Sequence, residues 1–188
     1  KGTSGGVMTA LPLPTGPADL QEACELFFLE AIRSARERIW IATPYFVPDE
    51  QVMAALELAR LRGVEVRLLL PEKAGHLVVH LASYGYYETA ERIVMEIYRY
   101  QNGFLHQKVL LVDDTLAAVG TANLDNRSFR LNFELSIVLW DRAFAAAVES
   151  MLREDFGESR RAAAGELDDK PFWFRFGVSL SRLLGPVL

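Results

Sequence analysis

The sequence predicts an α/β domain, because short β-type runs alternate with amphipathic helical segments over most of its 188 residues. The runs are rich in Val, Ile and Leu and are bounded by Pro, Gly or Asp, whereas the segments between them repeat apolar residues at helical spacing. The composition, 51% hydrophobic and 24% charged, is typical of a globular protein. We therefore expect one domain whose sheet is covered by helices on its faces.

The first half of the chain is predicted to begin with a leader. Residues 1–19 are rich in Gly, Pro, Ser and Thr, which indicates a leader or the tail of a linker. The expected elements after it are a helix at 20–38, a strand at 39–43, a helix that Asp49 caps and that stops before Gly63, and a strand at 64–70.

The second half repeats the alternation and contains a predicted hairpin. Its expected elements are a helix at 76–93, a strand at 95–100, strands at 109–113 and 116–120 that pair through a turn at Asp113 and Asp114, a strand at 133–140 and a helix at 143–156. The domain is therefore expected to span residues 20–158.

Residues 159–188 divide into a polar connector and an apolar tail. The tail begins at Pro171, is rich in aromatic residues such as Trp173, and has Arg175 and Arg182 as its only charges. Such a segment can lie in a membrane interface. It can equally be a terminal helix that docks on the domain or on a missing half, and the sequence leaves both open.

The net charge and the cysteine content limit the function classes. A formal charge of −5 argues against nucleic acid as a partner, since phosphate binding normally needs a basic face. The single cysteine, Cys24, excludes an intramolecular disulfide and is expected to pack a helix face. No run of about 18 apolar residues is present in the sequence.

The motif that carries chemistry begins at His106, two residues before Lys108 at the start of an apolar run. Side chains at i and i+2 on a strand point to the same face, so these two stand side by side. By itself, this pair would indicate only the end of a strand, with a hydrogen-bonded histidine and a lysine whose ammonium reaches water. However, Asp113 follows at the spacing H-x-K-x4-D, and six residues later comes the run G-T-A-N, residues 120–123.

The pattern H-x-K-x4-D-x6-G-[ST]-x-N resembles the HKD motif of the phospholipase D superfamily. The segments TPYFVPDE, LRGVEVRLLLP, YQNGFLHQK and NRSFRLNFE are similar to the C-terminal catalytic half of bacterial cardiolipin synthases. Thr121 stands where Ser is commoner but keeps the hydroxyl. The resemblance implies a phospholipase D-like domain, in which a mixed β-sheet is flanked by helices on both faces.

Displacing an alkoxide from a phosphodiester requires a nucleophile, a cation for the anionic oxygens and an acid for the leaving group. His106 is the candidate for nucleophile, through a phosphohistidine, or for acid. Lys108 would hold a non-bridging oxygen, with hydrogen bonds from Asn123 and Thr121. The resemblance assigns the orientation of the imidazole to a carboxylate at Glu134.

Asp113, Gly120 and Arg127 complete the predicted site. Asp113 belongs to the motif and is counted with the catalytic residues, although its odd spacing from Lys108 points it away and indicates a structural partner. Gly120, Thr121 and Arg127 are the predicted substrate contacts. The resemblance places the loop of Arg127 near the site, and a charge on a helix surface is the alternative.

No cofactor and no metal are expected, because lysine and amide donors supply the charge stabilisation that a metal would otherwise provide. His76 and His80 are four residues apart, a spacing that can bind zinc, but no third ligand is evident in the sequence.

The proposed chemistry needs two HKD sites, whereas this sequence carries one. The chain is therefore either the second half of a two-motif enzyme, which its start without Met favours, or one protomer of a homodimer. The first reading predicts phosphatidyl transfer that makes cardiolipin from glycerophospholipid at the cytoplasmic face of a bacterial inner membrane, with water as acceptor giving a phospholipase instead. The alternatives are a homodimeric phosphodiesterase acting on nucleic acid and a non-enzymatic lipid-binding remnant.

Overall fold

The computed structural model describes residues 8–72, 83–87, 90, 93, 95–163, 165–166 and 170–182. Its strands are β1 (Ala10–Thr15), β2 (Arg38–Ala42), β3 (Phe46–Val47), β4 (Glu65–Pro71), β5 (Glu96–Tyr100), β6 (Val109–Val112), β7 (Leu116–Gly120), β8 (Leu124–Asp125), β9 (Glu134–Trp140) and β10 (Ser159–Arg161). Its helices are α1 (Ala23–Ser34), α2 (Glu50–Leu61), α4 (Asn126–Arg130), α5 (Arg142–Gly157) and α6 (Phe172–Arg182).

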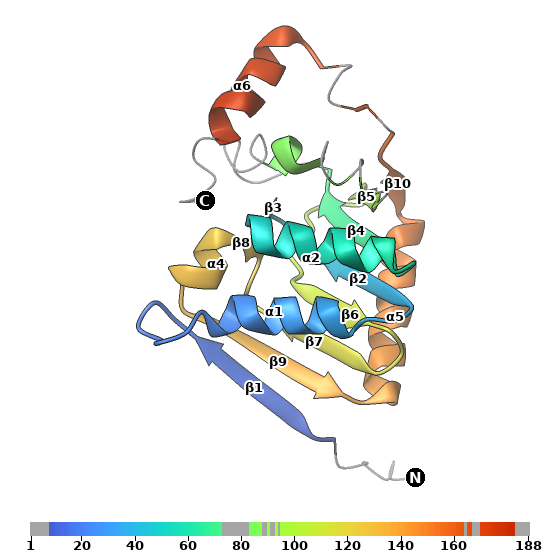
Figure 1. Cartoon of the computed structure of the whole chain (residues 1–188). Coiled ribbons are helices and arrows are strands. Elements are labelled where there is room, and N and C mark those ends of the chain that lie inside the picture. Colours follow the sequence, from blue (N-terminus) through green and yellow to red (C-terminus); the bar gives the residue numbers. More distant parts are fainter. Residues whose placement is uncertain are drawn as a thin grey trace.

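Eight of these strands form one mixed sheet in the order β1-β9-β7-β6-β2-β4-β5-β10. The pairs β2–β4 and β4–β5 are parallel, and the other neighbours are antiparallel. Helices α1 and α2 cover one face and α5 crosses the other (Figure 1). The predicted α/β architecture, a mixed sheet with helices on both faces, is confirmed.

The central strands are buried on both faces, which explains why they read as continuous apolar runs. In β2, Ile39 and Ile41 point into the core with α1 and α2, whereas Trp40 and Ala42 point into the core beneath α5. Each large apolar side chain removed from water in this way stabilises the fold by about 1.5–3 kcal/mol. The two cores therefore share one sheet, as the single-domain prediction requires.

Several predicted local signals are confirmed. The Asp49 side chain accepts a hydrogen bond from the backbone N–H of Val52 and caps α2. Gly63 follows the end of α2 with a φ of +89°, a conformation that favours glycine. Cys24 is buried in α1. Of the helix expected at 76–93, residues 83–87 are helical, while His76 and His80 lie outside the described residues.

The interpretation of residues 1–19 as a leader is corrected by strand β1. Ala10–Thr15 pairs antiparallel with β9 at the edge of the sheet, where Pro12 and Pro14 are tolerated because one side of the strand needs no hydrogen-bond donors. In the predicted polar connector, β10 pairs with β5 and forms the opposite edge. The sheet therefore extends beyond the expected boundaries of 20 and 158 on both sides.

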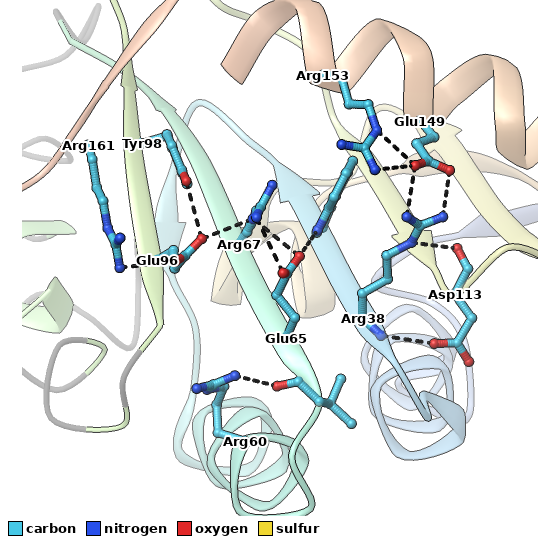
Figure 2. A network of polar contacts seen from close by, with 12 residues as sticks. Arg38, Arg60, Glu65, Arg67, Glu96, Tyr98, Asp113, Glu149, Arg153 and Arg161 are labelled. Carbon is cyan, nitrogen blue, oxygen red and sulfur yellow. Dashed lines mark hydrogen bonds and ion pairs between the residues drawn. The ribbon is translucent and has the colours of Figure 1, made fainter. Parts of the chain in front are cut away.

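Polar side chains follow the face of the sheet that α5 covers (Figure 2). The guanidinium of Arg38 binds the Glu149 carboxylate of α5, with hydrogen bonds of 2.8 and 2.5 Å. Arg67 of β4 binds Glu96 of β5 at 2.9 Å. Both guanidinium groups lie about 5 Å from the centre of the Trp40 ring, which they shield from water.

Asp113 ties the end of β6 to the start of β2. Its carboxylate accepts hydrogen bonds from the backbone N–H groups of Arg36, Glu37 and Arg38, at 2.9–3.3 Å. Its own backbone N–H donates to the Arg38 carbonyl at 3.0 Å. It turns the predicted β6–β7 hairpin with a φ of +53°, a conformation that Asp adopts more readily than most residues.

We expect Asp113→Ala to lower the free energy of unfolding by about 2–3 kcal/mol, because three backbone donors lose a charged acceptor. Urea unfolding followed by circular dichroism measures this. The matched control is Asp114→Ala in the same turn, whose side chain is 60% exposed and makes a single long ion pair with Arg142. Equal losses in the two variants would contradict the structural role of Asp113.

Candidate active site

His106 and Lys108 lie immediately before β6, at the end of the sheet where β7 finishes and β9 starts. The Gly120 N–H donates to the Lys108 carbonyl at 3.1 Å. The Thr121 N–H donates to the Leu135 carbonyl at 3.0 Å. Three segments that are distant in the sequence are therefore joined at one sheet end, and all of them carry predicted site residues.

The imidazole of His106 is in contact with the ammonium of Lys108. Lys108 Nζ lies 2.9 Å from the His106 carbonyl oxygen, 3.1 Å from Nδ1 and 3.2 Å from Nε2. The ring of Phe104 stacks on the imidazole with 5.4 Å between centroids. An ammonium can only donate and a neutral imidazole has one unprotonated nitrogen, so Lys108 can donate to whichever of the two ring nitrogens carries no proton.

The electrostatics of this pair favour a neutral imidazole. Burial and, second to it, the positive charge of Lys108 lower the pKa of His106 below its usual 6.5. Burial also lowers the pKa of Lys108, while the negative charges of Glu134 and Asp125 act in the opposite direction. Only the neutral imidazole has a nitrogen lone pair with which to attack phosphorus.

Glu134 lies beside Thr121. The Thr121 hydroxyl donates a short hydrogen bond to one Glu134 oxygen, and Asn132 Nδ2 donates to the other at 3.1 Å. The Thr121 hydroxyl also accepts from the Leu135 N–H at 2.9 Å. The Glu134 carboxylate thus has Thr121 and Asn132 as partners, and its charge acts on Lys108. Its predicted orientation of the His106 imidazole stays a prediction.

Asn123 is held by two residues that the sequence reasoning missed, Asp125 and Ser128. Asp125 caps α4 by accepting from the Ser128 N–H at 2.7 Å, and the Ser128 hydroxyl accepts from the Asn123 N–H at 3.0 Å. Burial raises the pKa of Asp125, and hydrogen bonds from Ser128 and the Asn123 side chain oppose that rise. The spacing D-x-x-S, which is typical of a helix N-cap, was the signal for this support.

Gly120 is a glycine because β9 passes very close to it. A Cβ at this position would lie 2.4 Å from the Leu135 carbonyl oxygen and 2.7 Å from the Ser136 Cα. Gly120 therefore has a packing role in the structure, and its contact with substrate stays a prediction. A small pocket opens here, lined by Phe28, Ile41, Ala42, Thr43, Lys108, Val109, Leu110, Ala118, Gly120, Ala122, Leu124 and Ser136.

Thr43 and Tyr45, from the TPYF segment, reach the same end of the sheet. The Thr43 hydroxyl donates to the Tyr45 carbonyl at 2.8 Å and accepts from the Leu124 N–H at 3.4 Å. The short parallel pairing of β3 with β8 holds the two segments together. Burial raises the pKa of Tyr45, and the negative charge of Asp125 adds to this, so the phenol remains protonated.

Asp113 and Arg127 are the two remaining residues of the predicted site. Asp113 is at the opposite end of β6 from Lys108, and backbone N–H groups occupy its carboxylate, so it is structural rather than catalytic. Arg127 is exposed on α4, and its carbonyl accepts from Leu131 and Asn132. Its contact with substrate stays a prediction.

No group of three or more His, Cys, Asp or Glu residues that could hold a metal ion occurs in the part of the chain that the structure describes. Nor is any helix there long and apolar enough to cross a bilayer.

The fold and this motif define a phospholipase D-like domain. The structure matches phosphatidylserine synthase of Haemophilus influenzae with a TM-score of 0.75 and 16% identity, over 98% of this chain and 49% of that one. It matches Nuc of Salmonella typhimurium, described as a phospholipase D family member, with a TM-score of 0.68 and 21% identity, over 82% of this chain and 99% of that one.

Within that class, residues 28–156 match the family model described as "Cardiolipin synthase, PLD-like domain", and the chain belongs to this family. It is 53% identical over 176 residues to cardiolipin synthase A of Pseudomonas putida, covering 94% of this chain and 37% of that protein. With cardiolipin synthase A of Pseudomonas aeruginosa the identity is 54% over 174 residues, covering 93% of this chain and 36% of that protein. The chain thus spans little more than a third of the length of these relatives.

We expect Lys108→Gln to raise the pKa of His106, because a positive charge that opposes imidazole protonation is removed. The rise will be partial, since burial, the larger cause of the lowered pKa, remains. An NMR titration of the imidazole protons between pH 4 and 8 measures it, with Lys170→Gln as the control for loss of a distant lysine. An unchanged pKa in Lys108→Gln would show that the two groups do not interact.

Proposed function

We propose that the protein containing this domain transfers a phosphatidyl group between glycerophospholipids, making cardiolipin from phosphatidylglycerol and releasing glycerol. The observation that carries the proposal is the contact of the His106 imidazole with the Lys108 ammonium, at a sheet end shared with Thr121, Asn123 and Glu134. The 53% identity to a protein named cardiolipin synthase A supports this choice of substrate.

In the first step, a nitrogen of one imidazole attacks phosphorus. The N–P bond forms as the bond from phosphorus to the glycerol oxygen breaks, and an imidazolium from a second HKD site gives that oxygen its proton. Lys108 and Asn123 bind the non-bridging oxygens, whose charge grows in the transition state. Asp125 and Ser128 position Asn123 for this task.

In the second step, the phosphohistidine passes its phosphatidyl group to an acceptor hydroxyl. The oxygen–phosphorus bond forms, the N–P bond breaks, and the proton of the hydroxyl returns to the second imidazole. A second phosphatidylglycerol as acceptor gives cardiolipin, whereas water gives phosphatidic acid.

The second imidazole must come from another HKD domain. The chain spans 37% of the length of its Pseudomonas putida relative, so the remainder of a longer protein is our preferred source. A homodimer that brings two copies of His106 together is the second possibility, and it would suit a phosphodiesterase. We place the complete protein at the cytoplasmic face of the bacterial inner membrane, with this domain bound peripherally.

We expect His106→Ala in the complete protein to reduce turnover of phosphatidylglycerol by at least about a thousandfold, since it removes the nucleophile or the acid. Conversion of radiolabelled lipid to cardiolipin measures the rate, and circular dichroism checks folding. His80→Ala removes an imidazole outside the predicted site and serves as the control. A near-normal rate in His106→Ala would exclude the assignment.

We also expect the isolated 188-residue chain to fold but to show little or no transfer as a monomer, because it supplies only one of the two imidazoles. Analytical ultracentrifugation gives the oligomeric state, and assays on phosphatidylglycerol vesicles and on a soluble phosphodiester give the activity. Full turnover by a strictly monomeric chain would disprove the mechanism with two histidines.

A further inference from the structure

Helix α6 stands apart from the main sheet (Figure 1). An aromatic contact holds it to the domain. The Phe174 ring meets Tyr84 edge to face, with 5.1 Å between centroids, and Val178 is buried. Tyr84 in turn packs on Tyr87, and the buried Arg99 guanidinium of β5 lies 4.8 and 4.3 Å from the centres of these two rings. One face of α6 is therefore anchored to the domain.

The opposite face of α6 is apolar and exposed. Phe172, Phe176 and Leu180 recur every four residues and so share one side of the helix, with Trp173 beside them. Their exposed fractions are 83%, 61%, 56% and 71% for Phe172, Phe176, Leu180 and Trp173. Successive residues turn by about 100°, which places this side away from Phe174 and Val178. The anchoring contact thus presents a large aromatic surface to the outside.

The charges around this surface indicate the kind of partner. Residues 171–188 contain Arg175 and Arg182 and no acidic residue, although the whole chain has a formal charge of −5. Arg175 is exposed on α6. Tryptophan and phenylalanine next to arginine on a short helix are typical of helices that lie in the headgroup layer of a bilayer.

We propose that α6 docks this domain on a membrane containing anionic phospholipid. Phe172, Trp173, Phe176 and Leu180 insert into the boundary between headgroups and acyl chains, and Arg175 pairs with lipid phosphate. The choice of a lipid partner rests in part on the proposed function, since phosphatidylglycerol is itself anionic. The docking surface lies outside the candidate active site and uses none of its residues.

The contacts of residues 83–87 connect this surface to the site. Tyr84 binds α6, whereas Tyr86 packs on Phe46 of β3 with 6.4 Å between ring centroids. The Ser83 hydroxyl accepts from the Phe46 N–H at 3.4 Å, and β3 pairs with β8, which directly follows Asn123. A membrane bound at α6 is therefore linked through one short helical segment to the strands that support the site.

Binding of the 188-residue chain to vesicles tests the proposal. Flotation with vesicles of phosphatidylglycerol or of phosphatidylcholine gives the partition coefficient of each variant. We expect Trp173→Ser with Phe176→Ser to lower binding to phosphatidylglycerol vesicles at least tenfold. The matched control, Leu58→Ser with Leu61→Ser, removes two exposed apolar side chains of α2 and should change binding less than twofold. Arg175→Glu should weaken binding to phosphatidylglycerol severalfold and leave phosphatidylcholine unaffected.

Tryptophan fluorescence gives a second readout. In a Trp140→Phe background the remaining tryptophans are Trp173 and the buried Trp40, so a blue shift on addition of phosphatidylglycerol vesicles reports insertion of Trp173. Absence of the shift, or equal binding by the α6 double variant and its α2 control, would overturn the proposal. So would a change of oligomeric state in the α6 double variant without vesicles, which would assign the face to a protein interface.

The test is independent of catalysis. Vesicle binding needs no turnover, so His106→Ala should bind phosphatidylglycerol vesicles as the unmodified chain does. If the catalytic assignment fails, binding through α6 remains measurable. If α6 fails to bind, turnover of a soluble phosphodiester by the complete protein still reports on His106.

Discussion

Two backbone hydrogen bonds at one end of the sheet, from Gly120 to the Lys108 carbonyl and from Thr121 to the Leu135 carbonyl, hold the candidate site together. They join the ends of β6, β7 and β9, which carry the imidazole, the hydroxyl and the carboxylate. The bonds require β9 to pass within a distance of Gly120 that no Cβ would allow. The arrangement of the reactive groups therefore depends on a glycine at position 120, which has no side chain to collide with β9.

Around this junction, burial shifts the pKa values of the ionisable groups. Lys108 is partly removed from water and lies against His106, which favours the neutral form of the imidazole. The same burial makes the ammonium a stronger partner for phosphate than a lysine in free solvent would be, because screening by water is reduced. Asp125 and Ser128 belong to this environment through Asn123, although they were not part of the predicted motif.

The architecture was largely predictable because both faces of the sheet are buried, which makes its central strands apolar runs at 39–43 and 109–113 and leaves only Glu65 and Arg67 as charges at 64–70. Strand β1 was not predictable from the sequence, because Pro12 and Pro14 are typical of a linker. Only pairing with β9 makes this segment a strand. The spacing of His106 and Lys108 predicted their proximity, since period two is local. The contact of Glu134 with Thr121 was not predicted, because it depends on the register in which β7 pairs with β9. The spacing of a motif does not reveal how two strands are aligned.

Strand β1 has a consequence for assembly. A regular ladder with β9 leaves Pro12 and Pro14 with their ring nitrogens toward the outer edge, where a further strand would need N–H donors. This side of the sheet cannot recruit a neighbouring chain by strand addition, so it resists the edge-to-edge growth that leads to aggregates. Any association of the domain on this flank must therefore use side chains instead of a continued backbone ladder.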